Sequence, residues 1–376
     1  MASQEAYIAM SISSKINWIA ALVIVHALLF FSKEVRAEPY LAYKNNFACS
    51  NCHVNPDGGS LRNQAGQAYG QSVLAAKSSQ LDTSSFLRVA DYLQLGGDMR
   101  FNANFEQNDT DQETQSFEIH SAQIYAAVSL PGEKLSLILD QTVAPGVSIN
   151  REAYLLYKMG DDQYLKMGKM FLPFGIRLED DSAFVRQVTG TNFDNSDNGI
   201  AYGKSFGRTE LDIFVTNGTS QVSNDDEHFL YGARVEHRFD DFRLGAGLIY
   251  NDKDAETIIY NAYAATSLGR FTFLAEADWI ELNSMSAGGT IEQAQLAALF
   301  EVNYQWQRGL NLKATTEYFD PDQDTDEDQQ TRHSVVMEYT PISHLQFRLG
   351  FRQQDDIPQQ PENNKEIMFL QTHLYF

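Results

Sequence analysis

The two cysteines of the chain lie three residues apart, in Cys49-Ser50-Asn51-Cys52-His53. Cys-x-x-Cys-His is the pattern of covalent c-type haem attachment. Two thiols at this spacing add to the two vinyl groups of a haem, and the adjacent histidine is then held against the iron as an axial ligand. We therefore predict one covalent haem c, bound by Cys49, Cys52 and His53, with His53 as the ligand of the haem iron.

Other uses of a Cys-x-x-Cys pair fit this sequence less well. A redox-active pair expects a βαβ context, and none is visible in the pattern. A disulfide across two intervening residues would close a very small loop. A structural zinc site needs further ligands nearby, and between residues 38 and 119 the only Cys and His residues are Cys49, Cys52 and His53. Haem attachment is thus favoured.

The flanking residues must position this motif. Residues 54–59 are turn-forming, and residues 60–77 are expected to be helical with Ser60 as a possible N-cap. As a hypothesis, the carbonyl of Pro56, or one near it, accepts a hydrogen bond from the free ring N–H of His53 and orients the imidazole. We expect a monohaem cytochrome c module with its linker over residues 38–92, too small for a large core of its own.

The N-terminus has the features of an export signal. Lys15 precedes an apolar run over residues 18–31, and Val35 and Ala37 offer a cleavage site, so we predict a signal peptide over residues 1–37. An N-terminal membrane anchor is the alternative. The run is shorter than the roughly 20 residues that a spanning helix needs, which argues against a helical membrane protein. Export agrees with haem attachment, which occurs outside the cytoplasm.

Composition excludes two further classes. Aromatic residues make up 12% and hydrophobic residues 43% of the chain, which is not the composition of a disordered protein. Acids outnumber bases by 50 to 28, giving a formal charge of −22, so nucleic acid is not expected as a partner.

From Leu93 onward the hydrophobic pattern has period two, as in strands with one face in lipid and one in water. The final strand ends on Phe376, which resembles the terminal signal of bacterial outer-membrane barrels. We predict an all-β fold: a 16-stranded antiparallel transmembrane β-barrel over residues 93–376, preceded by the small α-helical haem module. The strands of a soluble β-sandwich or propeller also alternate apolar and polar residues, but their outer faces are polar and exposed to water. The expected strands are 93–106, 116–130, 134–142, 151–158, 163–171, 198–204, 209–217, 229–239, 242–252, 258–268, 270–281, 290–306, 310–320, 331–341, 344–353 and 365–376.

Strand parity suggests where individual side chains face. Met99 shares the parity of the apolar positions and should face lipid. His120 has the opposite parity to Phe117 and Ile119, so it could face the lumen. We predict His120 as the distal ligand of the haem iron, because Met and His are the usual sixth ligands.

A long loop at 173–198 follows the segment Lys169-Met170-Phe171-Leu172-Pro173-Phe174-Gly175-Ile176-Arg177. This segment resembles phosphate-selective porins, which implies a third extracellular loop folded into the lumen. Acids outnumber bases in the loop, which argues against anion selectivity. The acidic run 320–328 would concentrate cations at the mouth, or would be a solvated surface or bridge to lipopolysaccharide.

A haem motif followed by a porin-like barrel resembles the fused cytochrome–porins of iron-oxidising bacteria, on the order of the parts and on residues 47–56. The resemblance implies an electron carrier rather than a hydrolase or transferase. It also implies localisation in the bacterial outer membrane and contact with its lipid, with the haem module on the periplasmic side or in the lumen. The partners implied are a periplasmic electron-transfer protein and an extracellular redox donor or acceptor such as iron(II). A diffusion porin whose haem module is a plug or sensor is the alternative, and a soluble periplasmic haem protein is a third.

Overall fold

The computed structural model describes residues 38–77, 88–90, 92–109, 112–130, 132, 134–193, 195–220, 224, 226–252, 255–286, 289–360 and 363–376. The signal peptide expected over residues 1–37 lies outside the described residues. None of the helices in the described part of the chain has the length and apolarity needed to cross a membrane.

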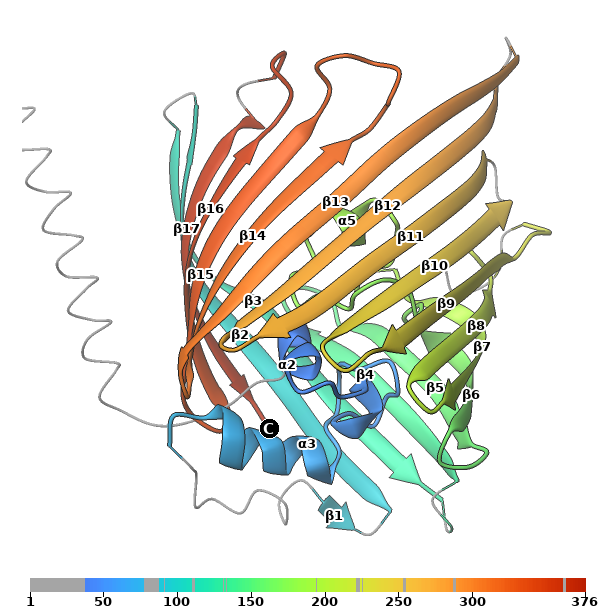
Figure 1. Cartoon of the computed structure of the whole chain (residues 1–376), viewed down its shortest axis with the longest axis vertical. Coiled ribbons are helices and arrows are strands. Elements are labelled where there is room, and N and C mark those ends of the chain that lie inside the picture. Colours follow the sequence, from blue (N-terminus) through green and yellow to red (C-terminus); the bar gives the residue numbers. More distant parts are fainter. Residues whose placement is uncertain are drawn as a thin grey trace, which may run out of the picture.

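Sixteen long strands of the described residues form one closed antiparallel barrel (Figure 1), which confirms the predicted fold. Each strand pairs with the next, and β17 closes the barrel by pairing with β2, from Tyr375 opposite Asp98 to Lys365 opposite Asn108. The barrel strands are β2 (Leu93–Asn108), β3 (Glu113–Ser129), β4 (Leu135–Ala144), β5 (Ile149–Lys158), β6 (Gln163–Met170), β7 (Asp197–Phe206), β8 (Thr209–Thr216), β9 (Leu230–Arg238), β10 (Phe242–Asp252), β11 (Ala255–Leu268), β12 (Phe271–Ser286), β13 (Gly289–Gln307), β14 (Leu310–Asp320), β15 (Gln330–Ile342), β16 (Leu345–Asp355) and β17 (Lys365–Tyr375). A short strand, β1 (Arg88–Ala90), pairs with the start of β2.

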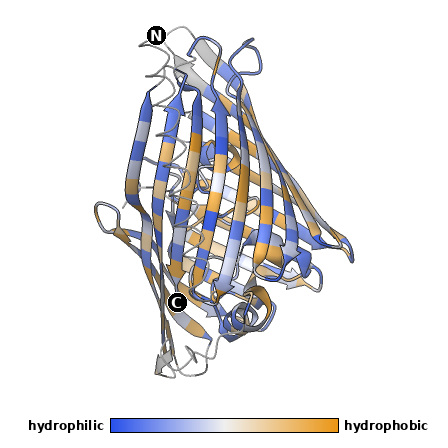
Figure 2. Cartoon of the chain, turned by 90° about the vertical axis from the view of Figure 1, so that its left-hand side faces the viewer, coloured by the Kyte–Doolittle hydropathy of each residue, from blue (hydrophilic) through white to orange (hydrophobic). Residues whose placement is uncertain are grey.

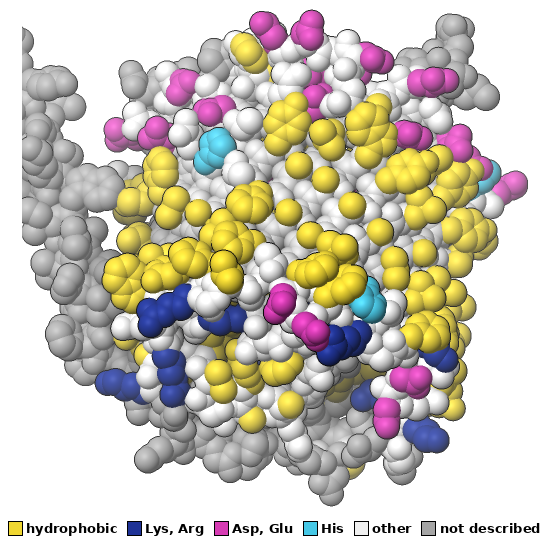
Figure 3. All heavy atoms as spheres, viewed as in Figure 1, with side chains coloured by type: hydrophobic (Ala, Val, Ile, Leu, Met, Phe, Trp, Pro, Cys, Tyr) yellow, Lys and Arg dark blue, Asp and Glu magenta, His cyan; other side chains and the backbone are white. Residues whose placement is uncertain are grey.

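Hydrophobic and hydrophilic residues alternate along many of the strands (Figure 2), and their side chains alternate in exposure. In β4, Leu137 and Leu139 are 40% and 37% exposed, whereas the alternate residues Ile138 and Asp140 are buried. Met99 is exposed, as its parity predicted. On the face seen in the space-filling view, hydrophobic side chains form a band, and acidic ones gather at the end that carries the long connections (Figure 3).

A plug segment, residues 38–77, lies at the opposite end of the barrel, among the short turns and beside the C-terminus (Figure 1). It contains α2 (Pro39–Lys44), the 3-10 turn η1 (Cys49–Asn51), α3 (Gln64–Tyr69) and a π-turn η2 (Gly70–Leu74). The predicted helix therefore starts later than expected. Ser60 has φ +49° and is no N-cap; the side chain of Asn63 caps α3 by accepting from the Gly66 amide at 3.0 Å.

A lumen loop, residues 171–196, connects β6 to β7 and carries the short helix α5 (Phe184–Gln187) inside the barrel (Figure 1). The loop and the plug segment share one apolar core with the wall, since Leu41 and Leu74 pack in the same cluster as Ile176, Val185 and Leu299. A segment of 40 residues that cannot bury much apolar surface alone thus obtains its core from the barrel.

Candidate functional site

The Cys-x-x-Cys-His motif forms a single helical turn. The amides of Cys52 and His53 both donate to the carbonyl of Cys49, at 3.1 and 3.0 Å. Residues three apart on such a turn share a face, and both thiols line the same lumen cavity of about 980 Å³. The turn thus presents its two sulfurs side by side to one space, as attachment of a single haem requires.

The imidazole of His53 lies beside the lumen cavity. Nδ1 is buried and has no hydrogen-bond partner among the described residues. Burial, with the nearby charges of Arg62 and Arg177, lowers the pKa of His53 to about 3, while a backbone hydrogen bond with Gly59 opposes this shift. The ring is therefore neutral, which is the form that binds a metal. The hydrogen-bonding backbone group is that of Gly59, near the expected Pro56.

The loop after His53 is bound to the barrel wall by a buried ammonium. Lys166 on β6 is fully buried and donates to Oδ1 of Asn55 at 2.6 Å. It also pairs with the carboxylate of Asp57, whose other oxygen accepts from Tyr164 at 2.7 Å. A buried charge is tolerated only where partners surround it, so this wall position requires the loop to be in place.

Further polar contacts fix the plug segment on other strands. The Ser60 hydroxyl lies 3.1 Å from a carboxylate oxygen of Asp140 on β4 and 3.2 Å from one of Glu152 on β5, and its single hydrogen can bond to either. On the far side of the lumen, Arg243 donates to the carbonyls of Ala42 and Phe47, both at 3.2 Å. The turn that carries Cys49 is thus held between two opposite arcs of the wall.

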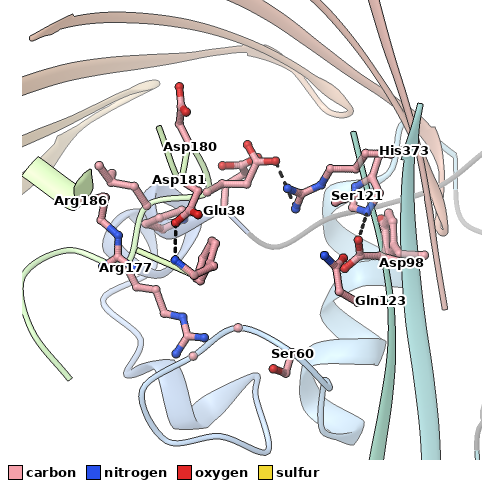
Figure 4. Close-up of a pocket in the computed structure, with 18 of the residues that line it drawn as sticks. Glu38, Ser60, Asp98, Ser121, Gln123, Arg177, Asp180, Asp181, Arg186 and His373 are labelled. Carbon is pink, nitrogen blue, oxygen red and sulfur yellow. Dashed lines mark hydrogen bonds and ion pairs between the residues drawn. The ribbon is translucent and has the colours of Figure 1, made fainter. Parts of the chain in front are cut away.

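The lumen loop covers this arrangement from above. Figure 4 shows Arg177 extending from the loop toward the plug backbone near Ser60. A Cβ on Gly59 would lie only 2.7 Å from its guanidinium, and Gly59 has φ +73°, so the close approach and the backbone both call for glycine. Wall arginines hold the loop: Arg348 and Arg100 pair with Glu179 at 2.7 and 3.3 Å.

The residues present fit a covalently attached haem better than the other uses of the pair. Both cysteines are free. Burial raises the pKa of the Cys49 thiol to about 12, whereas redox-active cysteines have a lowered pKa. The described residues contain no group of three or more His, Cys, Asp and Glu side chains arranged to hold a metal ion. Free thiols, a neutral histidine with an unpaired nitrogen and a cavity beside them are what haem attachment needs.

His120 lines the lumen cavity, as its strand parity suggested. Its charged neighbours are Arg100, Glu118 and the lumen-loop acids Glu179 and Asp180. No described contact joins it to His53, so its role as distal ligand stays a prediction.

Sequence reasoning missed a second lumen histidine. His373 on β17 is buried, its ring lies 5.0 Å from that of Tyr375, and the Arg62 guanidinium lies 4.5 Å from the same tyrosine ring. Its parity is opposite to that of the apolar residues of the last strand, and this signal could have identified it as lumen-facing.

The barrel and its inserted loop define a class: this is the 16-stranded fold of outer-membrane porins. Similar solved structures include an anion-selective porin from Comamonas acidovorans (10% identity, 76% of this chain and 99% of that chain, TM-score 0.58). Others are in-vitro folded OmpT of Vibrio cholerae (11%, 76% and 98%, TM-score 0.58) and OmpF of Salmonella typhi in complex with daunomycin (12%, 76% and 97%, TM-score 0.57). No family model matches the chain, and no curated protein matches it by sequence. At these identities the likeness concerns the fold.

Proposed function

We propose that this protein is an outer-membrane electron carrier in which a c-type haem, attached to Cys49 and Cys52 and ligated by His53, lies inside a porin-like barrel. The observation that carries the proposal is the Cys-x-x-Cys-His turn itself, held in the lumen with His53 Nδ1 unpaired. When bound, such a haem supplies one-electron redox chemistry.

The chain's own residues keep this site fixed within the lumen. Lys166, Ser60 and Arg243 connect the plug segment to three sectors of the wall, and the lumen loop covers it. The contacts that hold the plug segment also narrow the lumen of the barrel. This arrangement favours electron transfer over the flow of solutes.

Placement in the outer membrane rests on the outer surface of the barrel. The face in Figure 3 carries an apolar band, and aromatic side chains are exposed near the short turns, among them Phe206 at 56% and Trp306 at 55%. Apolar bands flanked by aromatic residues are typical of barrels that span a bilayer. The plug segment would then face the periplasm, where a soluble electron-transfer partner could reach it.

The charge at the other end favours a cationic extracellular donor. Acidic side chains gather there, including Asp322 and Asp324 in the connection between β14 and β15 (Figure 3). A barrel opening lined by charges of one sign raises the local concentration of ions of the opposite sign. Iron(II) is a donor of this class, and its oxidation to iron(III) would release the electron that the site carries inward.

A liposome assay tests this function. Purified protein is inserted into vesicles that enclose an oxidised dye, and iron(II) is added outside. We expect the dye to be reduced by the wild type and not by a Cys49→Ser/Cys52→Ser variant. At low salt, dye reduction should be slower with an anionic reductant of similar potential than with iron(II). Equal dye reduction by the variant and the wild type would refute electron transfer through this site.

A diffusion porin is the second candidate, and the comparisons with solved structures support it more directly than they support electron transfer. It is also favoured by the size of the cavity, about 980 Å³, which extends from the plug segment to residues of the lumen loop such as Arg186. Single-channel recording separates the two functions. A large stable conductance from the haem-loaded protein would favour the porin, and a closed barrel would favour the electron carrier.

A further inference from the structure

We propose that Arg177 binds a carboxylate of the haem, one of its propionate groups, and thereby raises the reduction potential of the site. This inference rests on the proposed function, because it assumes that a haem is attached to Cys49 and Cys52. It assigns to the lumen loop a role beyond narrowing the barrel.

Arg177 reaches the haem-attachment loop directly. A Cβ built on Gly59 would lie 2.7 Å from Nη2 of Arg177, and the charge of Arg177 acts on His53. Phe171 and Phe193 lie 4.9 and 5.5 Å from the guanidinium carbon and hold its plane by cation–π contact. The side chain is therefore positioned at the edge of the space that both thiols face.

Arg177 has no carboxylate partner among the described residues, unlike three other arginines of the lumen. Arg352 pairs with Asp180, Arg348 pairs with Glu179 at 2.7 Å, and Arg332 lies 3.5 Å from Glu317. For Arg177, no described residue provides a hydrogen bond or ion pair, and its Nε is buried and unpaired. Arg177 is half-buried, and a guanidinium without a carboxylate partner offers its remaining donors to an anion that enters the cavity.

The geometry selects the class of anion. Guanidinium groups bind carboxylates through paired N–H donors, and the open side of Arg177 faces the cavity lined by Cys49, Cys52 and His53. The propionates are the carboxylates that attachment at these cysteines would bring into that cavity. A cation near the iron stabilises the reduced form, because reduction lowers the positive charge of the metal.

Redox titration of the haem-loaded protein tests this inference. We expect Arg177→Gln to lower the midpoint potential, with about a tenfold change in the equilibrium constant for reduction, which corresponds to 59 mV for one electron. Arg177→Lys keeps the charge and should retain most of the wild-type potential. Arg208→Gln, which removes an exposed arginine paired with Asp240, is the charge-matched control and should not shift it.

The outcomes separate the inference from the function on which it rests. Absence of covalent haem from the wild type would refute the proposed function. Wild-type haem content with equal potentials in Arg177→Gln and Arg208→Gln would overturn the role of Arg177 alone. If Arg177→Gln loses its haem, Arg177→Lys decides. A Lys variant that keeps its haem at the wild-type potential supports the inference. A Lys variant that loses its haem, or whose midpoint potential is lowered, overturns it. A wild-type potential that moves with added phosphate would show a site open to diffusible anions and would also overturn it.

Discussion

Lys166, on strand β6, donates a hydrogen bond of 2.6 Å to Oδ1 of Asn55, two residues beyond His53. This contact joins a wall residue of the barrel to the loop that follows the haem motif. The ammonium is fully buried and also serves Asp57. The barrel therefore contributes to the proposed haem site, and the plug segment supplies the partners of an ammonium that would otherwise be buried without them.

Lys166→Met should release this loop. The substitution leaves Asp57 without its main counter-charge, and breaking a buried pair in this way costs roughly 3–5 kcal/mol. Hydrogen exchange of the amides of residues 53–62 should accelerate strongly, while the barrel remains folded. Lys169→Met is the matched control, because Lys169 lies on the same strand and donates to the carbonyl of Asn150 instead. Equal exchange in the two variants would contradict the role of Lys166.

Gly66→Ala should disturb the attachment turn through helix packing. A Cβ at this position would lie 2.1 Å from the carbonyl oxygen of Cys52, and backbone cannot move aside as a flexible side chain can. We expect a reduced yield of covalent haem, measured by haem staining after denaturing electrophoresis. Ala68→Gly, at an exposed position of the same helix, lowers only helix propensity, by roughly 0.5–1 kcal/mol, and should keep the yield. A full yield in Gly66→Ala would show that α3 does not need to pack this closely on Cys52.

The lumen loop should stay in place down to acidic pH. Burial alone would raise the pKa of Asp180, but Arg352 and Ser182 hold it below its ordinary value of 3.8. A carboxyl with a lowered pKa in the folded state contributes stability above its unfolded pKa and loses it as pH falls further. Exchange of the loop amides, corrected for intrinsic rates, should therefore be constant from pH 8 to about 4.5 and rise below about 3.8.

Asp180→Asn provides the control for this pH dependence. The variant should exchange faster at neutral pH, and the step below about 3.8 should be smaller. A wild-type loop that loosens as pH falls from 8 to 5 would contradict this assignment, because it would point to a group whose ordinary pKa lies in that range, such as a histidine, and not to Asp180.

Strand parity made most of the fold predictable. All sixteen expected strands are present, and Met99 and His120 face the sides that their parity indicated. Residues at each strand's ends were harder to place, since a loop such as 109–112 continues the polar pattern of its strands. Ser60 was chosen as N-cap by type alone, whereas its positive φ follows from the tight return of residues 53–62 against each other.

The contacts that make the site could not be derived from sequence, because they join residues far apart in the chain. Lys166 and Asn55 are 111 positions apart. The sequence of the lumen loop shows its acidic residues. It does not show that Arg352 and Arg348 of the wall pair with them. That pairing leaves Arg177 without a counter-charge, although acids outnumber bases in the loop. Only the closed barrel brings these groups together.

The most direct test of the account is the absorption spectrum of the purified, denatured protein in alkaline pyridine, compared with that of Cys49→Ser/Cys52→Ser. The account predicts one haem per wild-type chain, with the band position of a haem joined by two thioether bonds, that stays with the polypeptide after denaturation and is absent from the variant. The account would be contradicted if the wild-type barrel is exported and folded in cells that mature c-type cytochromes and still carries no covalent haem.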